Sequence, residues 1–194
     1  PSKPKPVKPE EPKKVELPAW MTEDAISTNE TDKGMCMSMW QPWASLVISG
    51  AKRLEGRVWR SDFRGRLWIH AASKALEEDE RLQIESQIKH EDASLPTSYP
   101  LSCLLGCIDV IDMISHEELL ERREAYARLL EAGTPPAAHV EYYIHEENES
   151  DYVFVCRRPK KLTMPLAMSG DHKIYSLPKP VHEAAKAQLA LAEN

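Results

Sequence analysis

Residues 36–59, CMSMWQPWASLVISGAKRLEGRVW, encode a strand, a helix and a second extended segment in order. The apolar run at 35–40 predicts a short strand, which a Gln-Pro pair interrupts. Residues 43–49 predict a short helix, because Pro fits the first helical position and Gly50 suits the residue that ends a helix. The extended pattern resumes at 52–59. These elements mark where the ordered part of the chain begins.

Positive charge is concentrated within this stretch, in GAKRLEGR at 50–57. Residues two apart on an extended chain share a face, so Glu55 and Arg57 lie together. A bulge or turn at either glycine would bring Lys52 round to Glu55. Glu55 would then brace one or two cations, and braced cations are preorganised for an anion such as phosphate. A solvated turn and a purely structural ion-pair brace are the alternatives that the spacing leaves open.

More cations and aromatic rings flank this stretch, and nucleic-acid grooves use such a mixture, with charge for the backbone and ring faces for bases. The alternatives are core tryptophans and a solvated edge of arginines. His70, inside an apolar strand, is expected to be a satisfied core residue. The candidate nucleic-acid contacts are Lys52, Glu55, Arg57, Trp40, Trp59, Arg64, Arg66 and Lys74. Outlying candidates are Arg157, Arg158, Lys160, Lys161, His172 and Lys173.

The remaining pattern alternates short strands with helices of unequal length and shows no regular βαβ order, which predicts an α+β fold with a mixed, curled sheet. Further strands are predicted at 67–72, 103–114, 152–156, 162–168 and 173–177, and helices at 75–91, 116–132 and 181–192. The segments at 95–101 and 134–150 are predicted loops.

The segment 103–114 is apolar on both faces, so it should lie at the centre of the sheet. Strict alternation would place Leu104 with Ile108 and Val110 on one face. For the helix at 116–132, Ser115 is the expected cap, with Glu118 placed for a capping box.

Residues 1–33 are rich in Pro and Lys and too poor in apolar residues to form a core. They predict a flexible linker, disordered in its Pro/Lys-rich part, ahead of an ordered domain at 34–194. Trp20 and Met21 are the exception, and a local anchor on the chain's own domain is the favoured interpretation. Because the first residue is Pro rather than Met, we expect a piece of a longer protein.

Composition excludes several function classes. The 25 Lys and Arg against 31 Asp and Glu give a net charge of −6, which argues against a wholly basic nucleic-acid coat but allows a local basic patch with weak binding. No apolar run approaches the roughly 18 residues of a membrane span, and no signal-peptide pattern is present.

The four scattered cysteines predict buried thiols rather than a zinc site. No nucleotide-cofactor or serine-hydrolase motif occurs, and no cofactor is expected.

Four positions match the signature Gly-x-Lys-x-x-Glu-x-Arg, namely Gly50, Lys52, Glu55 and Arg57. Through this signature and the segments CMSMWQPWASLVISGAKRLEGRVW, RGRLWIHAASK, YPLSCLLGCIDVID and YVFVCRRPKKL, the chain from residue 35 to 191 resembles the ASCH domain. The resemblance implies a PUA-like β-barrel with flanking α-helices and a cleft lined by the signature residues. Trp40 stands where related proteins are expected to carry His, which puts ligand preference in question.

The resemblance also implies a function. ASCH and PUA-like domains bind RNA or, in some cases, DNA, which makes this chain the nucleic-acid-binding domain of a transcription coactivator, present in nucleus and cytoplasm. The implied partners of the full-length protein are nuclear receptors and a helicase, in a complex linked to ribosome quality control. A monomer without membrane attachment is expected.

Two other function classes stay open. One is a protein-interaction module that uses the Pro/Lys tail and the charged helices at 75–91 and 116–132. The other is implied by the resemblance, since some small bacterial ASCH proteins look like amidohydrolases acting on N4-acetylated cytidine. In such an enzyme Lys52, with a pKa lowered by desolvation, would be base or nucleophile. Its second carboxylate is not placed by the sequence, and Asp109 and Asp112 are only candidates. We therefore do not expect an enzyme.

Overall fold

The computed structural model describes residues 17–22, 32–88, 94–134 and 138–192. Its six-stranded sheet has the order β2-β5-β4-β3-β1-β6. The strands are β1 (Met35–Gln41), β2 (Leu54–Arg57), β3 (Gly65–Ala75), β4 (Cys103–Ser115), β5 (Tyr152–Ala167) and β6 (Ile174–Ser176). The helices are η1 (Ala19–Met21), α1 (Trp43–Ser49), α2 (Glu78–Ser86), α3 (His116–Glu131), α4 (Ala138–Ile144) and α5 (Lys179–Ala192).

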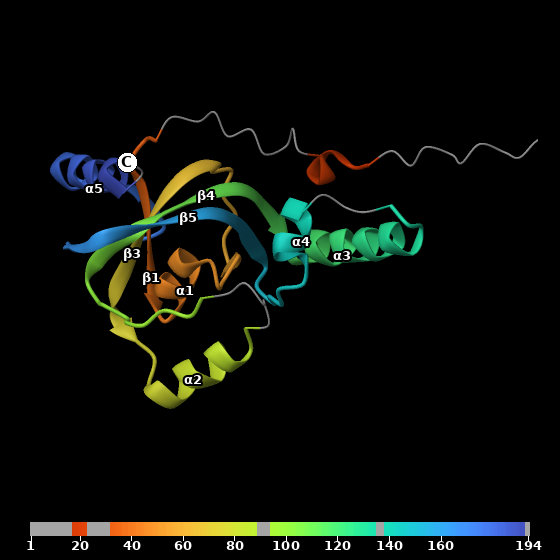
Figure 1. Ribbon diagram of the computed structural model, residues 1–194, viewed down its shortest axis with the longest axis horizontal. Helices are drawn as coiled ribbons and strands as arrows, with labels where there is room; N and C mark the ends of the chain where they lie inside the picture. The colour runs from red at the N-terminus through yellow and green to blue at the C-terminus, as the bar shows by residue number, and fades with distance from the viewer. Residues whose placement is uncertain (1–16, 23–31, 89–93, 135–137, 193–194) are drawn as a thin grey trace, which may run out of the picture.

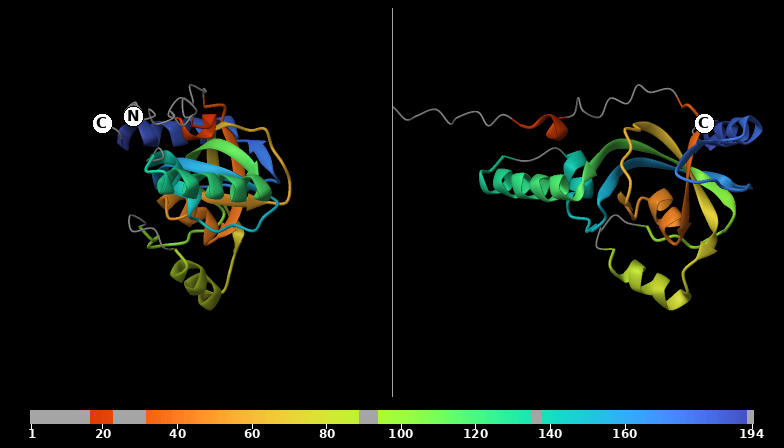
Figure 2. Two further views of the ribbon diagram at one scale, coloured as in Figure 1. Left: turned by 90° about the vertical axis from the view of Figure 1, so that its right-hand side faces the viewer. Right: turned by 180° about the vertical axis from the view of Figure 1, so that it is seen from behind.

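The sheet is mixed and strongly curled, as Figures 1 and 2 show. β1 and β3 run parallel, whereas the other paired strands are antiparallel. The predicted α+β class is confirmed. The prediction of a β-barrel is corrected. Within the described ranges no pairing joins the end strands β2 and β6, so the sheet is open.

Three apolar clusters fill the two faces of the sheet. The first lies inside the curl, where α1 packs on β1, β3, β4 and β5. The second joins η1, α3 and α4 to β2 and the end of β4. The third lies beneath α5. Met21 is fully buried in the second cluster, so the predicted anchor on the chain's own domain is confirmed. Most of the predicted linker at 1–33 lies outside the described residues.

β4 is central, as its two apolar faces predicted, but the predicted division of its faces is wrong. Leu104 packs beneath α5, while Leu105, Ile108 and Val110 pack against α1. The register of β4 against β5 shifts between Leu104 and Gly106, and again further along. A bulge inserts one residue and so exchanges the faces of all the residues that follow.

Several predicted boundaries are also corrected. The two strands predicted at 152–156 and 162–168 form one long strand, β5. The helix predicted at 75–91 is shorter, since its first residue belongs to β3 and 89–91 lie outside the described residues. The predicted loop at 134–150 contains α4, which buries Val140, Tyr143 and Ile144. Their spacing of three and one is helical, and burial of this face stabilises the helix.

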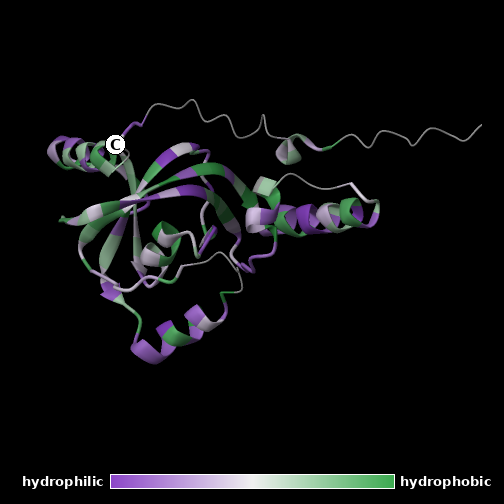
Figure 3. Cartoon of the chain, viewed as in Figure 1, coloured by the Kyte–Doolittle hydropathy of each residue, from purple (hydrophilic) through white to green (hydrophobic). Residues whose placement is uncertain are grey.

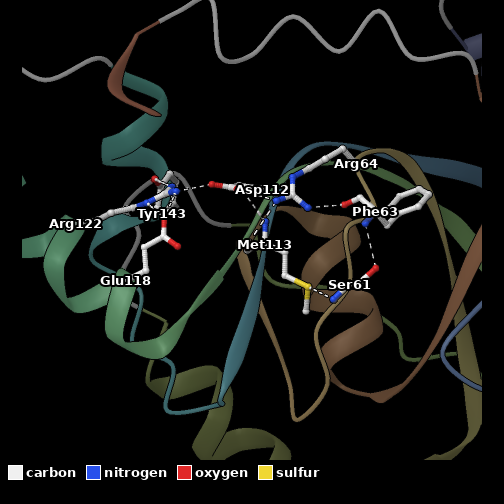
Figure 4. A network of polar contacts seen from close by, with 8 residues as sticks. All are labelled: Ser61, Phe63, Arg64, Asp112, Met113, Glu118, Arg122 and Tyr143. Carbon is white, nitrogen blue, oxygen red and sulfur yellow. Dashed lines mark hydrogen bonds and ion pairs between the residues drawn. The ribbon is translucent and has the colours of Figure 1, made fainter. Parts of the chain in front are cut away.

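Figure 4 shows the polar contacts that join α3 to the sheet. The Ser115 hydroxyl accepts the Glu118 N–H at 3.1 Å, so the predicted cap is confirmed. Glu118 does not complete a capping box, because its carboxylate accepts from Arg122 at 2.6 Å. Arg122 also donates to one oxygen of Asp112 at 2.5 Å, and Arg64 donates to the other at 2.6 Å. No helix in the described ranges is long and apolar enough to cross a membrane.

Candidate nucleic-acid interface

A left-handed glycine turns the chain from α1 into β2. Gly50 has φ 79° and ψ 0°, and its N–H donates to the Val47 carbonyl at 3.1 Å. The Lys52 N–H then donates to the Leu46 carbonyl at 3.0 Å. A residue with a Cβ is disfavoured at such positive φ, so Gly suits this position. The turn leaves Lys52 just before the strand that carries Glu55.

Glu55 holds two cations, one on each carboxylate oxygen. Lys52 Nζ lies 2.8 Å from Oε2, and Arg57 Nη1 contacts Oε1. The Glu55 side chain is only 6% exposed, against 15% for Lys52 and 20% for Arg57. The predicted brace is therefore present, and it fixes both cations in an environment largely screened from water.

The pKa of Lys52 bears on the chemistry of the site. Burial lowers this pKa, but the carboxylates of Glu55 and Glu146 outweigh burial and raise it above its usual value. Lys52 is therefore a charged donor at neutral pH. The amidohydrolase interpretation required the opposite shift, because a base or nucleophile must lose its proton.

Lys52, Glu55 and Arg57 lie in a cavity of about 480 Å³. Trp40, 49% exposed, forms part of its rim, and the Lys74 ammonium lies 5.3 Å from the centre of the Trp40 ring. The full lining is Ser38, Met39, Trp40, Trp43, Lys52, Glu55, Gly56, Arg57, Asn148 and Ser150. Two strands, one helix and a distant loop thus converge on the paired cations.

Sequence reasoning did not name the other six lining residues as site residues: Ser38, Met39, Trp43, Gly56, Asn148 and Ser150. For the last two, the signal was a glycine inside a strand, which indicates close approach of another segment. A Cβ on Gly56 would lie 1.9 Å from the Ser150 Oγ and 2.8 Å from the Asn148 Oδ1. The Ser150 N–H donates to that same Oδ1 at 3.0 Å, so this loop is itself fixed.

We expect Gly56→Ala to displace the 148–150 loop and to lower the free energy of unfolding by about 1–3 kcal/mol, as for other overpacked sites. The double variant Gly56→Ala/Ser150→Gly removes the nearest obstacle and should recover most of the loss. Urea unfolding of the two variants beside wild type measures both effects. Equal losses in the single and double variants would contradict the close approach.

Four predicted contacts lie outside the cavity lining: Lys74, which stands over the Trp40 ring, and Trp59, Arg64 and Arg66. Trp59 packs edge-on against Phe154, with ring centres 5.7 Å apart. Arg64 pairs with Asp112 at 2.6 Å, and Arg66 Nε faces Asp109 at 3.6 Å. Trp59, Arg64 and Arg66 face other partners, so the cavity gathers the signature residues and Trp40 but not the other candidates.

The other candidates either pair with residues of the domain itself or lie outside the cavity lining. Arg158 Nε lies 2.7 Å from Asp109, so both candidate catalytic aspartates are held by arginines away from the cavity. His70 is 2% exposed and its ring contacts Ser38 at 3.0 Å and the Met168 carbonyl at 3.1 Å, which confirms a satisfied core histidine. His172 and Lys173 are exposed and do not line the cavity.

The cysteines behave as predicted. Cys36, Cys103, Cys107 and Cys156 are buried free thiols. Burial raises the pKa of both Cys36 and Cys107 to about 12, so these thiols are inert near neutral pH. Within the described part of the chain, no group of three or more His, Cys, Asp or Glu could hold a metal ion.

Comparison with known proteins gives a family. The family model described as the ASCH domain matches residues 37–165. Activating signal cointegrator 1 of Mus musculus is 35% identical over 161 residues, which cover 81% of this chain and 25% of that protein. The Homo sapiens protein of the same name is 34% identical over 161 residues, with the same two coverages of 81% and 25%. The chain thus spans a quarter of the length of these curated relatives.

Among solved structures, the crystal structure of ASCH from Zymomonas mobilis is 17% identical, with a TM-score of 0.43, and covers 82% of this chain and 96% of that one. The family model spans more than half of the 194 residues and includes the whole signature. The chain therefore belongs to the ASCH domain family.

Proposed function

We propose that this domain binds a single-stranded stretch of DNA or RNA through the cavity at Lys52 and Arg57. The observation that carries the proposal is a pair of cations fixed by one buried carboxylate inside a cavity with an aromatic rim. Two cations and one carboxylate leave a net positive site in a chain of net charge −6. Such a site attracts an anion without a broadly basic surface.

The donors of Arg57 suit a phosphate. Its Nη1 donates to Glu55 and to the Gly56 carbonyl. Within the described residues its Nε and other Nη have no hydrogen-bond partner, so a planar pair of donors remains for two oxygens of one phosphate. Lys52 adds a charge beside them. Glu55 is then a positioning residue, which holds the cations rather than contacting the phosphate.

The rim supplies a surface for a base. Trp40 presents half of its side chain to solvent, and base stacking on an aromatic ring contributes about 1–3 kcal/mol. Lys74, over the same ring, adds a second cation near the entrance. The cavity volume, about 480 Å³, falls among small-ligand pockets of roughly 300–1,000 Å³, which favours one unstacked nucleotide over a duplex groove.

The relatives' name supports a proposal about the longer protein. Both are called activating signal cointegrator 1, and we propose that this chain serves as the nucleic-acid-binding part of a longer coactivator in nucleus and cytoplasm. Nuclear receptors and a helicase remain proposed partners of the whole protein, together with a role in ribosome quality control. The amidohydrolase alternative is not favoured, because the raised pKa keeps Lys52 protonated.

Fluorescence anisotropy with short labelled DNA and RNA, single- and double-stranded, tests the proposal. We expect Lys52→Ala/Arg57→Ala to weaken binding of the preferred single strand by about a hundredfold or more, since bonds to charged groups contribute about 1.5–3 kcal/mol each. The slope of log K against log salt should fall in magnitude by about 0.7 for each lost phosphate contact.

Two controls make the result interpretable. Arg128→Ala/Lys186→Ala removes two exposed cations that do not line the cavity and should leave affinity nearly unchanged. Arg57→Lys keeps the charge but loses the planar donors, so a folded protein with intermediate affinity is expected. Equal weakening in the control and cavity double variants would contradict the proposed site.

A further inference from the structure

A second, larger hollow adjoins the cavity. This groove of about 1,260 Å³ is bounded by α1, α2, α4 and the segment at 145–150. It shares Trp43, Lys52, Asn148 and Ser150 with the cavity, so the two hollows lie side by side. Its chemistry differs, and the proposed nucleic-acid site does not explain it.

One side of the groove is apolar. Trp43 and Leu46 come from α1, Tyr142 from α4, and Ile84 with Ile88 from α2 and the residues just after it. α2 has no buried residue, and Figure 3 shows apolar positions between its hydrophilic ones. Ile84 and Ile88 are four positions apart, so they lie on one face. Both side chains line the open groove.

Contacts of Arg81 and Glu85, which neighbour Ile84 and Ile88 on the same face of the helix, hold α2 in place. Arg81 pairs with Glu85 at 2.7 Å and lies 5.1 Å from the centre of the Tyr99 ring. The Tyr99 hydroxyl donates to the same carboxylate of Glu85. These polar contacts position α2 beside the loop before β4 without using Ile84 or Ile88.

The other side of the groove is acidic. Glu141, Glu147 and Glu149 are exposed and have no hydrogen-bond or ion-pair partner among the described residues. Glu146 differs, because its carboxylate accepts the backbone N–H groups of Arg53 at 2.6 Å and Leu54 at 3.0 Å. Three carboxylates are thus left to face a ligand.

The two cations that border the groove are already engaged. Lys52 is paired with Glu55. The Arg53 side chain donates to the Tyr142 carbonyl at 2.6 Å, and its guanidinium lies 3.8 Å from the centre of the Tyr142 ring. The uncompensated charge of the groove is therefore negative, which repels a nucleic acid and attracts a cation.

We propose that this groove binds a basic amphipathic peptide segment of a partner protein. Aliphatic or aromatic anchors of the peptide lie on the apolar side formed by Trp43, Ile84 and Ile88, which are partly exposed. Its lysines or arginines pair with the three glutamates. Recognition of an amphipathic helix in an apolar groove is a recurring mode, and charge complementarity selects the basic partner. The domain then holds a nucleic acid and a basic peptide in adjacent sites of opposite charge.

A labelled peptide of about 14 residues with Leu and Lys at helical spacing is the probe. Its anisotropy is followed on titration with the whole chain and without nucleic acid, so failure of the nucleic-acid proposal does not affect the result. Two comparison peptides carry Glu in place of Lys, or Gln in place of Leu. The proposal predicts saturable binding of the Leu/Lys peptide alone, and absence of such binding overturns it.

Matched variants locate the site. Glu147→Gln/Glu149→Gln and, separately, Ile84→Gln should each weaken the peptide at least about tenfold. Glu124→Gln/Glu131→Gln makes the same charge change on exposed positions of α3 and should leave affinity within about twofold. Circular dichroism confirms that each variant is folded. Equal losses in the two glutamate pairs overturn the proposal.

The chain's own lysine-rich segment at 1–16 is the competing occupant. Deleting this segment should leave peptide affinity unchanged if the groove serves a partner. A rise of tenfold or more on deletion would show that the segment occupies the groove in cis, and would overturn the assignment to a partner protein.

Discussion

Replacing Glu55 with Gln is expected to lower the free energy of unfolding by roughly 3–5 kcal/mol, the usual result of removing one partner from a buried ion pair. The substitution leaves Lys52 and Arg57 next to each other with no carboxylate between them. Both side chains are at least four-fifths buried, so water compensates little of the lost interaction. Urea unfolding followed by circular dichroism measures the change.

The matched control is Glu124→Gln on α3. Its carboxylate lies 4.0 Å from Arg128, with the two side chains 73% and 70% exposed. Exposed pairs of this kind contribute at most about 1 kcal/mol, so the control should be nearly as stable as wild type. A loss at Glu55 no greater than at Glu124 would show that the motif cations do not depend on their carboxylate.

Gly106→Ala is expected to destabilise the protein by about 3 kcal/mol or more, because the new methyl group meets backbone rather than a movable side chain. A Cβ on Gly106 would lie 2.1 Å from the Lys160 carbonyl oxygen and 3.1 Å from the Lys161 Cα. Relief requires β4 and β5 to separate at a bulge in the centre of the sheet. Thermal unfolding and the yield of soluble protein report the effect.

Gly133→Ala separates this steric effect from backbone strain. Gly133 has φ 69°, and a Cβ there would meet no atom within 4 Å. Its cost should be limited to the roughly 1–2 kcal/mol of placing a side chain in the left-handed region. If Gly106→Ala were no worse than Gly133→Ala, the tight contact between β4 and β5 would be wrong.

Local patterns predicted the elements well where one residue type decides the conformation. Gly50 ends α1, Ser115 caps α3, and the doubly apolar β4 lies at the centre of the sheet. Sequence periodicity failed at the bulges, because alternation along one strand carries no signal about a residue inserted against its neighbour. It also missed α4, a seven-residue helix that depends on tertiary packing more than on propensity.

The candidate site was also predicted only in part, because its local contacts follow from the sequence and its long-range contacts do not. The paired cations and Glu55 lie within six residues, so local geometry predicts their contact. Arg64 and Arg66 follow Glu55 by nine and eleven residues, and Asp112 and Asp109 of β4 pair with them outside the cavity lining. The 148–150 loop enters the cavity from far along the chain, and a single sequence does not show which distant loop will fill the space beside a glycine.

The most direct measurement of the proposed nucleic-acid site is a nuclear magnetic resonance titration of the ¹⁵N-labelled domain with a short single strand. The Arg57 side-chain N–H and the indole N–H groups of Trp40 and Trp43 report on the cavity. We predict saturable shifts of these signals at one affinity, with those of Trp59 and Arg64 nearly unmoved. Saturable binding that shifts the signals of Trp59 and Arg64 but not those of the cavity would contradict the proposed site. The absence of any shift at low salt would contradict it as well.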